Sequence, residues 1–137
     1  MQKIQKNEKN EKIEKKEKNE KSKGNLTIYQ KYMDLIYYSN DLVRKFPKSE
    51  RFALVNEIKN TLYGGLHVLI FAVKTFNITE KLSYLKKLDV YLYLLKIHIR
   101  LAFRYKYISV QNYSTWSTQI NDICNMLGGW INSCQKR

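Results

Sequence analysis

The sequence predicts an all-α protein: an antiparallel up-down-up-down four-helix bundle with a disordered, charged N-terminal tail. Three observations support this fold class. The 137 residues suffice for one domain, and 44% of them are hydrophobic, enough for a core. One proline and five glycines are too few for a fold of strands and tight turns. From Leu26 onward, apolar residues recur at helical spacing in four blocks.

The first 24 residues differ in composition from the rest of the chain. They are a low-complexity run of Lys, Glu, Asn and Gln in which only Met1, Ile4 and Ile13 are apolar. Such a segment cannot bury enough apolar surface to offset the entropy lost on ordering. We therefore divide the chain into a disordered tail, residues 1–24, and a four-helix bundle, residues 25–137.

The first two predicted helices are separated by a proline. The first ends at Phe46, because the residue before Pro47 is disfavoured in helical geometry. The second begins after Ser49, which we expect to be its N-cap. The predicted inward residues are Ile28, Tyr32, Leu35, Ser39, Leu42, Val43 and Phe46 in the first helix, and Val55, Ile58, Leu62, Leu66, Leu69 and Val73 in the second.

The third and fourth predicted helices are capped by Thr79 and Ser109, and the third extends to about Lys106. Two glycine pairs, Gly64-Gly65 and Gly128-Gly129, lie inside helical patterns, and we interpret both as points of close helix approach. Short connections make sequential helices antiparallel. The predicted inward residues are Leu85, Leu88, Leu92, Leu95, Ile99 and Phe103, then Tyr113, Trp116, Ile120, Ile123, Leu127, Ile131 and Cys134.

The third helix has a second apolar face. Its residues are spaced four, three and four apart, and at 100° per residue they lie opposite the core face. In so short a chain, a helix that is apolar on two opposite sides indicates self-association. The alternative is a monomer with scattered exposed aliphatic residues. The predicted interface consists of Val90, Leu94, Ile97 and Leu101.

The net charge of +13 indicates contact with nucleic acid or another polyanion. Residues 1–24 hold nine Lys and five Glu and so contribute +4, which leaves +9 for the predicted bundle. A coding bias toward lysine is an alternative explanation, because 20 Lys stand against 5 Arg.

The basic residues are expected to gather at one end of the bundle. The first and third helices point the same way, so their C-terminal ends lie together. Tyr105 and Tyr107 at this end are available for stacking on bases. For some of the cations, an interaction with the helix dipole is the alternative role. The candidate binding residues for nucleic acid or a partner are Arg44, Lys45, Lys48, Arg51, Lys86, Lys96, Arg100, Arg104 and Lys106.

The sequence has no pattern typical of catalysis. His67 and His98 stand alone, and no Walker loop, paired carboxylates at helical spacing or nucleophile elbow occurs. Cys124 and Cys134 would lie about 15 Å apart along a helix, which indicates buried thiols and neither a disulfide nor a metal site. No apolar run is long enough to span a membrane. We predict a cytoplasmic non-enzyme without metal or cofactor.

Four stretches carry a family resemblance. They are residues 46–52 (Phe-Pro-Lys-Ser-Glu-Arg-Phe), residues 100–102 (Arg-Leu-Ala), Ile108-Ser109 followed by Tyr113, and residues 126–130 (Met-Leu-Gly-Gly-Trp). Together they resemble the accessory variability determinant (Avd) family of diversity-generating retroelements. That family is related to the four-helix-bundle proteins encoded in ribosomal RNA intervening sequences. The resemblance covers about residues 28–134, and Leu-Gly-Gly-Trp is its most specific part.

The resemblance implies a basic homopentameric barrel of four-helix bundles. Such proteins bind the retroelement's reverse transcriptase, contact RNA and DNA, and support mutagenic copying of a template repeat without being catalytic. The alternatives are a stand-alone RNA-associated bundle and a purely structural self-assembling bundle. By position, the resemblance implies binding roles for Arg51, Arg100 and Arg104, and subunit contacts for Leu94, Ile97 and Leu101.

Overall fold

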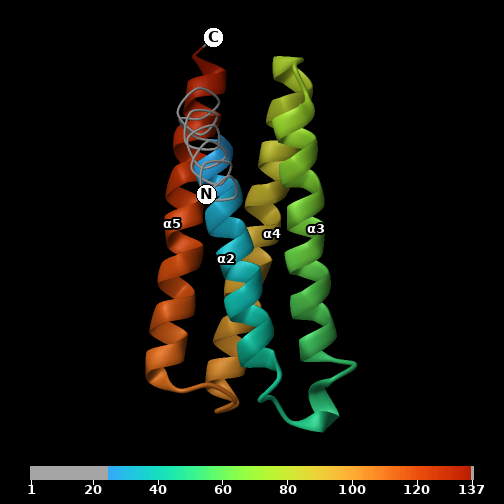
Figure 1. The fold of residues 1–137 in the computed structure, drawn as a ribbon, viewed down its shortest axis with the longest axis vertical. Helices are drawn as coiled ribbons and strands as arrows, with labels where there is room; N and C mark the ends of the chain where they lie inside the picture. Colours follow the sequence, from blue (N-terminus) through green and yellow to red (C-terminus); the bar gives the residue numbers. More distant parts are fainter. Residues whose placement is uncertain (1–24, 137) are drawn as a thin grey trace, which may run out of the picture.

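The computed structural model describes residues 25–136, which form four α-helices and one short 3-10 helix (Figure 1). No strand occurs between residues 25 and 136, and the predicted all-α four-helix bundle is confirmed. The predicted disordered tail, residues 1–24, lies outside the described residues. The elements are α2 (Asn25–Val43), η1 (Lys48–Glu50), α3 (Leu54–Lys74), α4 (Ile78–Arg104) and α5 (Val110–Gln135).

The four helices form a closed ring of contacts. α3 packs against α2 and α4, and α5 packs against α4 and α2, so α2 and α4 are diagonal to each other. Consecutive helices run in opposite directions, as Figure 1 shows. The end of α2, the whole of η1, the end of α4 and the start of α5 therefore meet at one end of the bundle (Figure 1, bottom).

The core contains nearly all of the predicted inward residues. Every predicted inward residue of α2 is buried, including the polar Ser39. Ser39 is satisfied because Trp116 Nε1 donates a hydrogen bond of 2.8 Å to its Oγ. Tyr32 Oη donates to the Leu62 carbonyl oxygen at 2.6 Å, and burial raises the pKa of the Tyr32 phenol far above its ordinary value. The two polar contacts thus join α2 to α5 and to α3 inside the core.

The two glycine pairs have different surroundings. A Cβ atom at Gly65 would collide with the hydroxyl of Tyr32, and one at Gly64 would lie 2.7 Å from Cε1 of Tyr91. The predicted close approach is therefore confirmed for Gly64-Gly65. It is wrong for Gly128 and Gly129, which are exposed, and where an added Cβ would meet nothing within 4 Å.

Two of the three predicted N-caps are wrong. The chain after Pro47 forms η1, and α3 starts only at Leu54, whose N–H donates to Glu50 Oε2 at 3.1 Å, so Ser49 caps nothing. At α4 the cap is Asn77 and not Thr79, because Asn77 Oδ1 accepts from the Glu80 N–H at 3.1 Å. Ser109 does cap α5, and its Oγ accepts from the Asn112 N–H at 3.0 Å.

The ends of α2 and α4 come slightly earlier than predicted. α2 ends at Val43, although Phe46 is still buried, and α4 ends at Arg104. Phe103 was predicted to point inward and does not. It is 36% exposed and stacks on Tyr113 with ring centroids 4.5 Å apart, and Ala102 takes the buried position.

Candidate nucleic-acid interface

Most of the predicted binding residues gather where α2, η1 and α4 end. Six of the nine lie there, all exposed, and we call these six the basic end. Arg100 is exposed and lies one turn before the end of α4, whereas Lys86 and Lys96 lie farther along the helix. Lys96 is half-buried and lies near the Cys124 thiol of α5, so it faces a neighbouring helix. The basic end consists of Arg44, Lys45, Lys48, Arg51, Arg104 and Lys106.

A contact between two loops holds the basic end together. Tyr107 Oη, in the loop between α4 and α5, donates to Glu50 Oε1 of η1 at 3.1 Å. The Tyr107 ring packs on Phe46 with centroids 5.4 Å apart, which joins the same loop to the segment after α2. These contacts bring together cations from three separate parts of the chain. Sequence reasoning did not find the Glu50–Tyr107 bond, because no local pattern links residues 57 positions apart.

Three acidic residues lie near the basic end, and two of them, Glu50 and Asp41, are already engaged, whereas Glu57 in the first turn of α3 forms no salt bridge within the described residues. Glu50 accepts hydrogen bonds on both carboxylate oxygens, from Tyr107 and from the Leu54 N–H. Asp41 pairs with Arg44, with Nη1 and Oδ1 3.7 Å apart, and both side chains are exposed, so this pair is weak. The other five cations of the basic end form no salt bridge within residues 25–136. The basic end therefore has an excess of positive charge.

Lys106 has an unusual backbone conformation, with φ of 63°. It follows the C-cap Tyr105, and its N–H donates to the Phe103 carbonyl while the Tyr107 N–H donates to that of Ala102. This is the Schellman arrangement, in which the left-handed position normally holds glycine. A lysine there is strained by about 1–2 kcal/mol.

We expect Lys106→Gly to raise the free energy of unfolding by about 0.5–1 kcal/mol, because the relief of strain exceeds the extra chain entropy of glycine. Chemical denaturation measures this gain. Lys106→Ala is the matched control, since it removes the charge and keeps the strain. A gain of equal size in Lys106→Ala would show that charge repulsion, and not backbone strain, is relieved.

The second apolar face of α4 is exposed as predicted. Val90 is 59% exposed, and Leu94 and Ile97 are each 39% exposed. Leu101 differs because it is partly buried against the core. The face thus presents three aliphatic side chains on the side of α4 opposite its buried residues.

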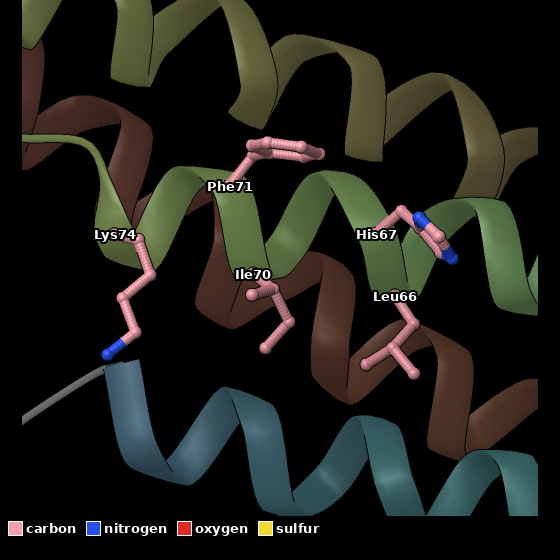
Figure 2. Close-up of a pocket in the computed structure, with 5 residues that line it drawn as sticks. All are labelled: Leu66, His67, Ile70, Phe71 and Lys74. Carbon is pink, nitrogen blue, oxygen red and sulfur yellow. The ribbon is translucent and has the colours of Figure 1, made fainter.

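A shallow apolar pocket of 430 Å³ lies along α3. Figure 2 shows Leu66 and Ile70 on the side of α3 that faces α2, and Phe71 on the other side. The remaining lining residues are His67 and Lys74. Phe71 stacks on Tyr84 of α4 with centroids 5.3 Å apart, so part of the lining is fixed by packing. No carboxylate lines this pocket, and it offers no arrangement of acid and base.

The two histidines and two cysteines of residues 25–136 lie on three different helices, α3, α4 and α5. His67 is exposed, and burial lowers the pKa of the half-buried His98, an effect that Glu57 partly opposes. Cys124 and Cys134 form no disulfide, and burial raises the pKa of the Cys124 thiol. No group of three or more potential metal ligands occurs in the described chain. None of the described helices is long and apolar enough to cross a membrane.

Fold and surface together define a four-helix bundle with a basic end and an outward apolar face. The chain belongs to the bAvd-like family, whose model matches residues 26–134. The resemblance to the Avd family is thereby confirmed. Membership indicates an accessory protein of a diversity-generating retroelement, and the family is one of non-catalytic proteins. A comparison with curated proteins gives no match.

Proposed function

We propose that this protein is a non-catalytic accessory factor of a diversity-generating retroelement, a homo-oligomer that binds nucleic acid and the reverse transcriptase during mutagenic copying. Family membership supports the retroelement role and the contact with the reverse transcriptase. The proposed nucleic-acid site is the basic end, with Arg100 beside it. The proposed self-contact is the apolar face of α4, consistent with a homopentamer.

The basic end is the observation that carries this proposal. A helix dipole favours cations near the C-terminus of a helix, which accounts for Arg104 and also for Arg44, Lys45 and Lys106, all within two residues of a helix end. It does not account for Lys48 and Arg51, which precede the N-terminus of α3, where a dipole disfavours a cation. The six cations outnumber the three nearby carboxylates, and two of these, Glu50 and Asp41, are engaged, so the field of the cations is available to phosphates.

Charge reversal at the basic end tests the proposal. We expect Arg51→Glu with Arg104→Glu to weaken binding of a structured RNA at least roughly tenfold and to reduce the salt dependence by about two phosphate contacts. Fluorescence anisotropy at several salt concentrations measures both. Lys74→Glu with Lys136→Glu is the matched control, because it changes the net charge equally at the opposite end of the bundle.

The two variants have different expected outcomes. The control keeps most of its affinity if the basic end is the site. An equal loss in both variants would mean that only net charge matters. Failure of the unmodified protein to bind RNA at low salt would contradict the nucleic-acid role and favour a purely structural bundle.

A further inference from the structure

We infer that the basic end binds unpaired nucleotides of a single-stranded nucleic acid, with bases stacking on Phe52 and Tyr105. The inference rests on the proposed function, since it names the class of nucleic acid that the same site takes. Phe52 was not among the candidate residues identified from the sequence.

The first observation is the exposure of Phe52. Its side chain is 87% exposed in the short segment between η1 and α3. A phenylalanine kept in water forgoes about 2 kcal/mol of burial energy. The other exposed phenylalanines of α3 and α4 differ, because Phe71 stacks on Tyr84 and Phe103 on Tyr113. Phe52 and Phe76 form no such pair within the described residues, and of these two only Phe52 lies beside the basic end, so exposure identifies the site only together with the cations.

A second exposed ring lies at the same junction. Tyr105 is 56% exposed, and its ring centroid is 5.7 Å from that of Tyr107. Tyr107 is hydrogen-bonded to Glu50, which precedes Phe52 by two residues. This bond therefore fixes the two loops that carry Phe52 and Tyr105 to each other. The two rings therefore lie at the same end of the bundle although they are 53 positions apart in the sequence.

Cations flank both rings. Arg51 directly precedes Phe52, and Arg104 and Lys106 lie on either side of Tyr105. All three cations are exposed. Lys106 has a left-handed backbone conformation that favours glycine, so the lysine at this position lowers the stability of the fold. Exposed rings interleaved with cations are typical of sites where phosphates bind cations and unpaired bases stack on aromatic side chains.

A duplex would not use this combination of groups. Its bases are stacked on one another, so a protein surface without an element shaped to enter a groove contacts mainly phosphates. Cations alone would suffice for that purpose, and the exposed rings would add nothing. The pairing of ring and cation in both loops therefore favours a single strand over a duplex.

The test uses the full chain and four labelled probes of about 16 nucleotides. They are a single-stranded oligo-dT, the matching oligo-U RNA, an abasic strand with the same phosphate backbone, and a DNA duplex. Anisotropy gives the affinity for each probe at one salt concentration. Comparison of the first two probes tells whether DNA or RNA supplies the preferred bases.

We expect the single strands to bind more tightly than the abasic strand and the duplex. Phe52→Leu with Tyr105→Leu should weaken binding of the single strands about 5- to 100-fold and leave the abasic strand unchanged. Phe52→Trp should retain binding. Phe76→Leu is the matched control, because Phe76 is 94% exposed at the other end of the bundle and should have no effect.

Two results would overturn the inference, and they are distinguishable. In the first, all four probes bind with equal affinity and Phe52→Leu with Tyr105→Leu leaves these affinities unchanged. The basic end then contacts phosphates only, and the proposed function stands without the inference. If no probe binds even at low salt, the nucleic-acid function fails and the inference fails with it.

Discussion

Gly65→Ala is expected to lower the free energy of unfolding by about 1–3 kcal/mol, even though alanine is the better helix former. The added Cβ would collide with the Tyr32 hydroxyl and lie 3.1 Å from Tyr32 Cζ. Tyr32 is fully buried, and the hydrogen bond to the Leu62 carbonyl oxygen holds its hydroxyl in place. Overpacking costs about 1–3 kcal/mol, and loss of the Tyr32–Leu62 hydrogen bond adds about 1 kcal/mol. The gain in helix propensity, about 1 kcal/mol, offsets only part of this.

Gly128→Ala is the matched control for this prediction. Gly128 also lies inside a helix, but an added Cβ there would meet nothing within 4 Å. We therefore expect this variant to raise the free energy of unfolding by up to about 1 kcal/mol. Urea denaturation of both variants measures the difference. If the two changes have the same sign and size, the contact between Tyr32 and Gly65 does not limit the packing of α2 on α3.

A double-mutant cycle separates the two contributions. Tyr32→Phe removes the hydroxyl that the new Cβ would strike, and it also removes the hydrogen bond to Leu62. The double variant Tyr32→Phe with Gly65→Ala should therefore be more stable than the sum of the single changes predicts, by about 1 kcal/mol or more. Additive effects would indicate that the two residues do not act through their contact.

The helical pattern predicted most of the fold because it reports which side of each helix is buried. In α2 the spacing identified even the polar Ser39 as inward, and Trp116 explains this by its hydrogen bond. The caps of α3 and α4 were mispredicted because several residues near each start can accept a backbone hydrogen bond. Asn77 and Thr79 are both suitable by type, and only the path of the chain after Lys74 selects Asn77.

The position of the basic end was predictable from the sequence, because helix direction decides which residues lie at the same end of the bundle. Antiparallel helices place Arg44 and Arg104 at the same end, and this needs no knowledge of side-chain contacts. The Glu50–Tyr107 hydrogen bond and the left-handed backbone of Lys106 depend on how two loops meet, which periodicity does not report. Phe52 was overlooked for the same reason, since periodicity does not report which residues of a loop remain exposed.

Val90→Lys with Ile97→Lys is expected to convert an assembly of this protein into monomers of 16.4 kDa that keep their helical content. Both side chains are exposed in the single chain, so neither lysine should disturb the core. In a self-contact through α4, each lysine would instead be removed from water without a partner, at a cost of several kcal/mol per ion. Leu101 is unsuitable for this test because it packs partly against the core.

Light scattering together with circular dichroism distinguishes the outcomes of this change. Ile70→Lys is the matched control, because Ile70 has the same 39% exposure as Ile97 but lies on α3. We expect the control to keep the mass of the unmodified assembly, which is five times the chain mass if the family resemblance extends to stoichiometry. An assembly that survives both α4 substitutions would exclude this face as the subunit contact. A loss of assembly in Ile70→Lys alone would instead assign the contact to the apolar pocket along α3, because Ile70 lines that pocket.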